Sequence, residues 1–205
     1  MFSFKRNERD LAHHARKFGK CAATFLGAAV LMGCVGAQAD LPAARWDETP
    51  QAQDWTKASL SMLEEDAAVL VETTPADIEA WCPAYDEANP EQRAAFWNGL
   101  LSSLAYREST FREDAISSNG KWHGLLQISP ATARGYGCAA GTSEALREGE
   151  ANLRCALRIW SSTVVRDGVI AADQGGVAAD WGPLQREALR NDIRGWVSEQ
   201  DYCQS

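Results

Sequence analysis

The chain has 205 residues, with 20 Lys and Arg against 28 Asp and Glu and a formal net charge of −8. The first 39 residues hold six of the basic and two of the acidic residues, which leaves 14 basic and 26 acidic residues, or −12, on the remainder. This balance argues against a nucleic-acid partner, because a duplex-binding protein of this size needs a basic face. A hydrophobic content of 45% with eight Trp also excludes a disordered chain and suits a single domain.

Residues 1–39 have the layout of a secretory signal peptide. Residues 5–20 are basic on balance, residues 21–35 are apolar, and Ala37-Gln38-Ala39 follows as a cleavage site. The apolar run is shorter than the roughly 20 residues that a membrane-spanning helix needs. We therefore expect export to the periplasm. In the alternative, Leu31-Met32-Gly33-Cys34 acts as a lipobox, and a lipid on Cys34 attaches the protein to the membrane.

Cleavage after residue 39 leaves four cysteines, Cys82, Cys138, Cys155 and Cys203. An even number without a C-x-x-C pair, and with His123 as the only histidine left, favours two disulfides over a zinc site. Disulfides also fit an oxidising compartment. Of the three possible pairings we predict Cys138–Cys155 as a local bridge and Cys82–Cys203 as a link between the start and the end of the domain. We expect no metal and no cofactor.

Hydrophobic periodicity and turn signals predict a mostly helical fold in one domain, without convincing strands. The polar residues 40–53 are expected to form a flexible lead. Predicted helices then cover, approximately, residues 54–71, 89–110, 129–135, 150–166 and 184–196. Asn89-Pro90 and Ser129-Pro130 are typical helix starts, because a capping side chain precedes a proline in the first turn. We divide the chain after residue 39 into a lead with one helix at 40–75 and a helical domain at 76–205.

The helix predicted over 89–110 carries a carboxylate on its apolar stripe. Three apolar residues at intervals of four and three form this stripe: Trp97, Leu101 and Leu104. Glu108 occupies the next position. Burial and the nearby helix C-terminus both disfavour its negative charge, so its pKa should be raised, as a general acid requires. In the alternative, Glu108 is a boundary residue paired with Arg107 or Arg112.

Two segments resemble the lytic transglycosylase domain of the SLT type. Glu108-Ser109-Thr110-Phe111 is similar to the family motif E-S-x-F, and Gly124-Leu125-Leu126-Gln127-Ile128 is similar to G-L-M-Q-I. The resemblance extends from about Trp81 to Cys203. It implies a single lysozyme-like helical domain of the superfamily that includes goose-type lysozyme.

The resemblance also implies an activity and a set of site residues. The substrate would be the glycan strands of peptidoglycan, cleaved between N-acetylmuramic acid and N-acetylglucosamine to leave 1,6-anhydromuramyl ends. Glu108 aligns with the single acid/base, Ser109 with a supporting serine and Gln127 with a glutamine of the substrate groove. Aromatic rings offer apolar area with a polar handle, so the candidates for stacking on sugar rings are Trp122, Tyr136 and Trp181. For each of them, packing in the core is the alternative role. An envelope-assembly protein is a further candidate partner, because bulk charge would not hold an acidic domain on a wall that carries carboxylates.

Asp180 departs from the family pattern. Relatives carry a tyrosine just before Trp-Gly-Pro, where it is expected to hydrogen-bond the catalytic carboxylate. Asp180 either points away from Glu108, or points inward and raises the pKa of Glu108 further. Two other functions therefore stay open: a lysozyme-type hydrolase that uses Asp180, and a non-catalytic glycan-binding or envelope-assembly protein on the same fold.

Overall fold

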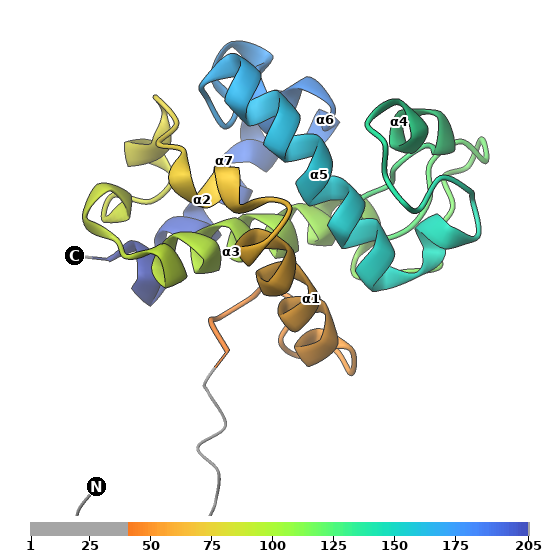
Figure 1. Cartoon of the computed structure of the whole chain (residues 1–205), viewed down its shortest axis with the longest axis horizontal. Helices are drawn as coiled ribbons and strands as arrows, with labels where there is room; N and C mark the ends of the chain where they lie inside the picture. Colours follow the sequence, from red (N-terminus) through yellow and green to blue (C-terminus); the bar gives the residue numbers. More distant parts are fainter. Residues whose placement is uncertain (1–40, 205) are drawn as a thin grey trace, which may run out of the picture. The chain divides into compact units, whose positions relative to one another are not determined.

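The computed structural model describes residues 41–204, which belong to one compact unit. The expected signal segment and Cys34 lie outside the described residues. The α-helices are α1 (Ala52–Glu64), α2 (Ala68–Glu72), α3 (Pro90–Ser109), α4 (Pro130–Gly135), α5 (Gly149–Asp167), α6 (Gly182–Gln185) and α7 (Glu187–Ser198). Single turns of 3-10 helix, η1 to η6, lie at Ile78–Ala80, Tyr85–Glu87, Ala145–Arg147, Ala172–Gln174, Gly176–Ala179 and Asp201–Cys203. Extended pairing over 41–204 is limited to two isolated bridges, so this part of the chain is mostly helical, as predicted (Figure 1). None of its helices combines the length and the apolar character needed to span a bilayer.

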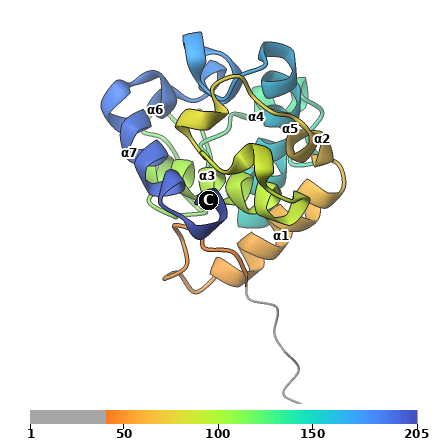
Figure 2. The same ribbon diagram turned by 90° about the vertical axis from the view of Figure 1, so that its left-hand side faces the viewer.

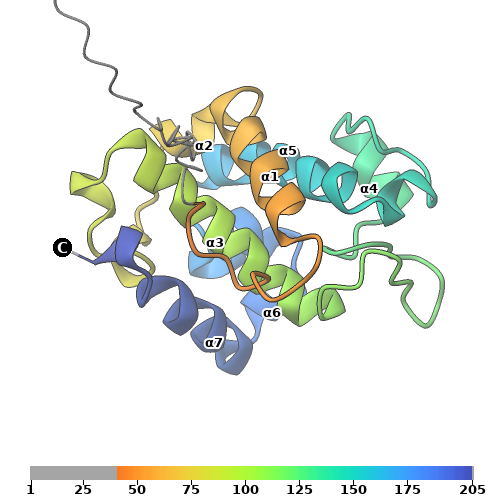
Figure 3. The ribbon, with the colours of Figure 1, turned by 90° about the horizontal axis from the view of Figure 1, so that it is seen from below.

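Helix α3 is the central element, and its start is determined by local sequence. The Asn89 side chain accepts a hydrogen bond from the Gln92 backbone N–H at 2.9 Å, and the Gln92 side chain accepts one from the Asn89 N–H at 3.0 Å. This reciprocal pair is a capping box, and Pro90 follows in the first turn without losing a needed hydrogen bond. Figures 2 and 3 show α3 between α1 on one side and α7 on the other. The predicted helix over 89–110 is thus confirmed.

A row of tryptophans links α3 to the second half of the chain. The rings of Trp97 on α3 and Trp160 on α5 are 6.2 Å apart between centroids. Trp160 in turn meets Trp181 edge-to-face at 5.9 Å. Aromatic side chains bury large areas, so this row supplies much of the core between α3, α5 and the segment before α6.

The expected flexible lead is wrong, because residues 44–46 are anchored in the core. Trp46 is fully buried, and its indole N–H donates to the Thr56 hydroxyl at 2.8 Å. The Arg45 backbone N–H donates to the Ser102 hydroxyl of α3, also at 2.8 Å. The prediction followed the polar composition of the segment and gave too little weight to Trp46, which anchors the segment to the helices.

The single helix predicted over 54–71 is also wrong, since it is divided into α1 and α2. Helix α1 ends at Glu64, and the backbone N–H groups of Glu65 and Ala67 both turn back to the Met62 carbonyl. Three consecutive acidic residues, 64–66, stand at this end, where the helix dipole opposes negative charge.

Both predicted disulfides are confirmed. Cys82 and Cys203 are bonded with Cα atoms 4.6 Å apart, and Cys138 and Cys155 with Cα atoms 5.2 Å apart. The first bridge joins the segment before α3 to the end of the described chain. The second joins the segment after α4 to α5.

Candidate active site

Glu108 stands in the last turn of α3, immediately before the chain reverses. Thr110 and Phe111 both have left-handed backbones, with φ of 52° and 63°. Two successive non-glycine residues in this region carry backbone strain, which the surrounding structure must hold in place. The sharp reversal leaves Glu108 half-buried at the end of the helix.

The Glu108 carboxyl is largely withdrawn from water, and within residues 41–204 it forms no ion pair. Burial raises its pKa from 4.5 to about 7, and the positive charge of Arg186 opposes this shift only in part. The alternative pairings with Arg107 and Arg112 are wrong. Arg107 donates to Asp192 at 2.7 Å, and Arg112 donates to the Ser109 carbonyl at 3.1 Å. A carboxyl with a pKa near neutrality is able both to give up and to accept a proton.

Gln127 lies on the loop that follows α3, in which two isolated bridges pair residues of the loop with one another. Its side-chain amide donates to the Gly124 carbonyl at 2.9 Å and to the Ala115 carbonyl at 3.3 Å. The Gln127 backbone is left-handed, with φ of 48°. The side chain lines a small cavity of about 40 Å³ together with Trp122, Asp180 and others. The structure therefore places Gln127 beside this cavity, which we call the recess, and its contact with substrate stays a prediction.

Asn152 holds this loop in place, and sequence analysis gave it no role. The side chain is fully buried; its oxygen accepts from the Leu126 N–H at 2.8 Å. Its amide group donates to the carbonyls of His123 at 3.0 Å and Leu146 at 2.8 Å. A side chain on Gly124 would collide with Asn152 and with the Leu146 carbonyl, and the Gly124 φ of 78° also requires glycine. In the sequence, the only sign of this role was the position of Asn152, an amide side chain near the start of a helix that also has an apolar stripe.

Tyr136 and Asp180 form a polar pair beside the same recess. The Tyr136 hydroxyl donates to an Asp180 carboxylate oxygen at 3.1 Å, and Asp180 is exposed. Burial first, and then the Asp180 charge, raises the pKa of Tyr136. The Glu108 pKa is shifted by burial and by Arg186. Asp180 is therefore turned toward Tyr136, and the inward arrangement that would raise the Glu108 pKa further is not adopted.

The other predicted site residues differ in exposure. Trp122 is 41% exposed, whereas Trp181 is 4% exposed and its indole N–H donates to the Leu126 carbonyl at 2.9 Å. This burial argues against sugar stacking by Trp181. Its hydrogen bond instead stabilises the loop that carries Gln127. Ser109 is 2% exposed and its hydroxyl donates to the Ala105 carbonyl at 3.3 Å, so it acts on the helix that carries Glu108.

The candidate site residues come from three segments. The end of α3 supplies Glu108, whose carboxyl feels the positive charge of Arg186 near α6. The loop over 115–128 supplies Gln127 and Trp122, which line the recess together with Asp180. Within residues 41–204, no three His, Cys, Asp or Glu side chains are grouped so that they could hold a metal ion. The chemistry available is proton transfer by the Glu108 carboxyl, and the recess lined by Gln127 adds polar groups and the exposed ring of Trp122.

Comparison with known proteins gives the family. The family model described as the transglycosylase SLT domain matches residues 87–166, which include both Glu108 and Gln127. A glutamate-to-glutamine mutant of Bd0314 DslA is 30% identical, with a TM-score of 0.72 over 80% of this chain and 100% of that one. The wild-type form 2 of Bd0314 DslA is 29% identical, with a TM-score of 0.71 and the same coverage. A search of curated proteins returned no significant match. The matched domain and the 30% identical structure with the same fold show that the chain belongs to the SLT-type lytic transglycosylase family.

Proposed function

We propose that the protein is an exported lytic transglycosylase that cleaves peptidoglycan between N-acetylmuramic acid and N-acetylglucosamine, with Glu108 as its single acid/base. The observation that carries this proposal is the Glu108 carboxyl at the end of α3, with a pKa of about 7 and no ion pair among the described residues. Membership of the family supplies the substrate class.

The reaction needs one carboxyl used twice. Protonated Glu108 donates its proton to the glycosidic oxygen as the bond to the muramyl C1 breaks. The resulting carboxylate then takes the proton from the C6 hydroxyl of the same muramyl ring, and O6 bonds to C1. Glu108 ends protonated, a 1,6-anhydro ring is formed and no water is consumed. Because the attacking hydroxyl belongs to the substrate and is already close to C1, a second carboxylate is less needed than in ordinary glycosidases.

The surrounding side chains have supporting roles in this proposal. Trp122 offers an exposed ring to a sugar face, and Gln127 offers a polar group at the recess. Tyr136 contributes through its hydrogen bond to Asp180, which lines the same recess. Ser109 and Trp181 act indirectly, by fixing the helix end and the Gln127 loop.

Export is supported by the signal-like residues 1–39 and by the two disulfides, which form in oxidising compartments. The periplasm is the compartment that also contains the proposed substrate. Cleavage after residue 39 would release a soluble domain, and lipidation of Cys34 would instead hold it at the membrane.

The test is mass spectrometry of the soluble products after residues 40–205 are incubated with purified peptidoglycan sacculi. We expect anhydromuramyl products, and a loss of about 100-fold or more in their rate of release with Glu108→Gln, which removes the proton donor. Asp180→Asn is the matched control, because it neutralises the other carboxyl of the site. It should still yield anhydromuramyl ends.

Each other outcome favours a different function. Reducing muramic acid ends that disappear with Asp180→Asn would indicate a hydrolase with two carboxylates. No soluble product from the unaltered protein, together with retention on sacculi, would indicate a glycan-binding or assembly role.

A further inference from the structure

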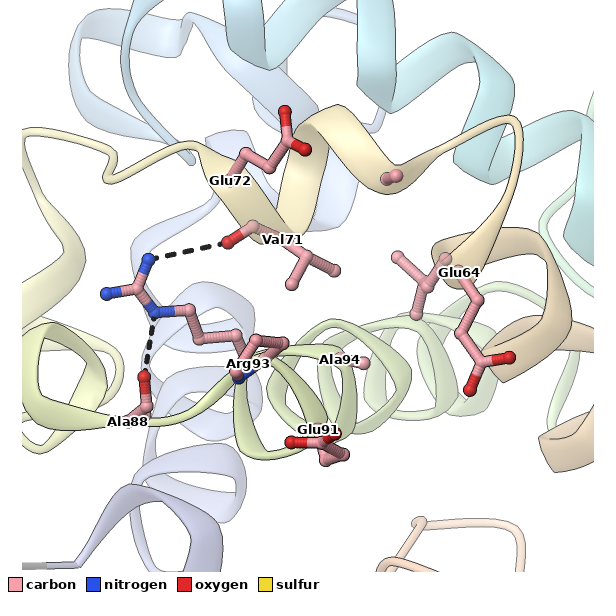
Figure 4. Close-up of a pocket in the computed structure, with 10 residues that line it drawn as sticks. Glu64, Val71, Glu72, Ala88, Glu91, Arg93 and Ala94 are labelled. Carbon is pink, nitrogen blue, oxygen red and sulfur yellow. Dashed lines mark hydrogen bonds between the residues drawn. The ribbon is translucent and has the colours of Figure 1, made fainter.

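A cavity of about 580 Å³ lies at the opposite end of α3 from Glu108, between α1, α2 and the first turns of α3 (Figure 4). Pro90 and Glu108 are 18 positions apart along the helix, or about 27 Å at 1.5 Å per residue. The cavity is therefore not part of the candidate active site. Its apolar lining consists of Leu63, Ala68, Val71, Ala88, Pro90 and Ala94. Its volume is in the range of about 300–1,000 Å³ that is typical of ligand-binding clefts.

Three exposed carboxylates surround this apolar lining. Glu64 ends α1, Glu72 ends α2, and Glu91 is in the first turn of α3. Figure 4 shows them around the cavity on three different helices. In the part of the chain that the structure describes, none of the three forms an ion pair.

Among the described residues that line the cavity, Arg93 is the only cationic one, and its guanidinium is already bound to other groups of the protein. The Arg93 guanidinium donates to the backbone carbonyls of Tyr85, Ala88 and Asp86 at 3.2 Å each, and it lies 4.9 Å from the centroid of the Tyr85 ring. Arg93 therefore secures the segment before α3, and it does not neutralise the carboxylates at the rim. The surface around the cavity keeps a negative charge.

A second cavity of about 470 Å³ continues this surface. It shares Glu64, Glu91 and Ala94 with the first, and adds the apolar side chain of Leu60 and the carboxylate of Asp201. The two cavities adjoin at these three shared residues. We call the acidic surface that contains both of them, with its apolar lining, the α1–α3 groove.

We propose that the α1–α3 groove docks a cationic amphipathic segment of a partner protein, with an apolar side chain in the cavity and Lys or Arg side chains on the rim carboxylates. Charge complementarity identifies the occupant, because an acidic glycan strand would be repelled by the rim while a basic peptide would be attracted. Apolar anchors flanked by matching charges are how grooves recognise amphipathic helices. The inference does not depend on the proposed reaction at Glu108.

The test measures binding of a fluorescently labelled synthetic peptide, with leucines on one helical face and lysines beside them, to residues 40–205. We expect saturable binding that weakens as salt is raised, because the rim is exposed. The variant Glu64→Lys/Glu72→Lys should bind about tenfold more weakly, since two attractions become repulsions. Both positions end a helix, where the dipole favours lysine, so this variant is expected to fold.

The matched control is Glu79→Lys/Glu144→Lys, which makes the same charge change at two exposed positions outside the groove. It should bind the peptide nearly as well as the unaltered protein. Equal weakening by both double variants would show attraction by bulk charge only and would overturn the proposal. So would undiminished binding of a peptide with serine in place of leucine. Cleavage of sacculi by Glu64→Lys/Glu72→Lys should be unchanged, which separates this test from that of the proposed function.

Discussion

Glu108 is largely buried and has no ion pair with any residue that the structure describes, and neighbouring side chains maintain this state. Arg107, the adjacent cation, is bound to Asp192, which Arg45 also contacts at 2.7 Å. Asp192 thus keeps a guanidinium away from the carboxyl, and its own pKa is lowered to about 2, most by the Arg45 hydrogen bond. The remaining positive influence on Glu108 comes from the exposed Arg186.

The raised pKa of Glu108 predicts a pH-dependent stability cost. Below its ordinary pKa of 4.5, the carboxyl is protonated in both the folded and the unfolded chain. Between pH 4.5 and about 7 the unfolded chain has lost this proton while the folded chain keeps it, so the free energy of unfolding falls as the pH rises through this range. Above about 7 the folded chain holds a desolvated carboxylate and the loss is complete. Glu108→Gln should therefore unfold like the unaltered protein near pH 4, and be more stable near pH 8 by about 1–3 kcal/mol. Urea denaturation at both pH values measures this difference. A variant that is no more stable at the higher pH would contradict the assigned burial.

The loop over 115–128 is the element that decides the geometry of the recess. It has almost no regular structure, and its shape depends on two isolated bridges and on contacts to α5 and Trp181. Sequence patterns identify helices through their period and their caps, as at Asn89 and Ser129, whose side chains accept hydrogen bonds from Gln92 and Thr132. A loop without a period offers no such signal, so the position of Gln127 was not predictable beyond the resemblance.

Asn152→Ala should release this loop. The substitution leaves the Leu126 N–H and two carbonyls without their partner, which we expect to cost about 2–4 kcal/mol in the free energy of unfolding. Asn98→Ala on α3 is the control, because Asn98 is also fully buried but neither atom of its amide has a partner among the described residues. Chemical denaturation of both variants tests the difference. Equal losses would indicate that the cavity left by each amide, and not its hydrogen bonds, determines the cost.

The two disulfide bridges of the described chain enclose loops of very different length. Cys82–Cys203 encloses a separation of 121 residues, and Cys138–Cys155 one of 17. The longer bridge holds the segment before α3 against the end of the chain, while the shorter one acts beside the candidate site.

Removal of the longer bridge should destabilise the protein more. In the chain-entropy model, a closed loop restricts the unfolded chain by about 3 kcal/mol at 15 residues and about 4.7 kcal/mol at 100 residues. Cys82→Ser/Cys203→Ser should therefore lower the free energy of unfolding by more than Cys138→Ser/Cys155→Ser does. Guanidinium denaturation of the two variants measures the order. A larger loss for the shorter bridge would show that native contacts around it, and not loop length, dominate.

The sequence by itself determined the helical class, the main helix starts, both disulfide pairs and the apolar-face position of Glu108. These depend on local caps, on the helical period and on the small number of ways to pair four cysteines. The tertiary structure alone decided which groups meet, because each such contact joins positions far apart in the chain. Asn152 reaches Leu126 across 26 residues, Tyr136 reaches Asp180 across 44, and Arg107 reaches Asp192 across 85. A period shows which face of a helix is buried, but the neighbour on that face is set by how the helices pack. The α1–α3 groove is a result of that packing, since no single segment contains both its floor and its rim.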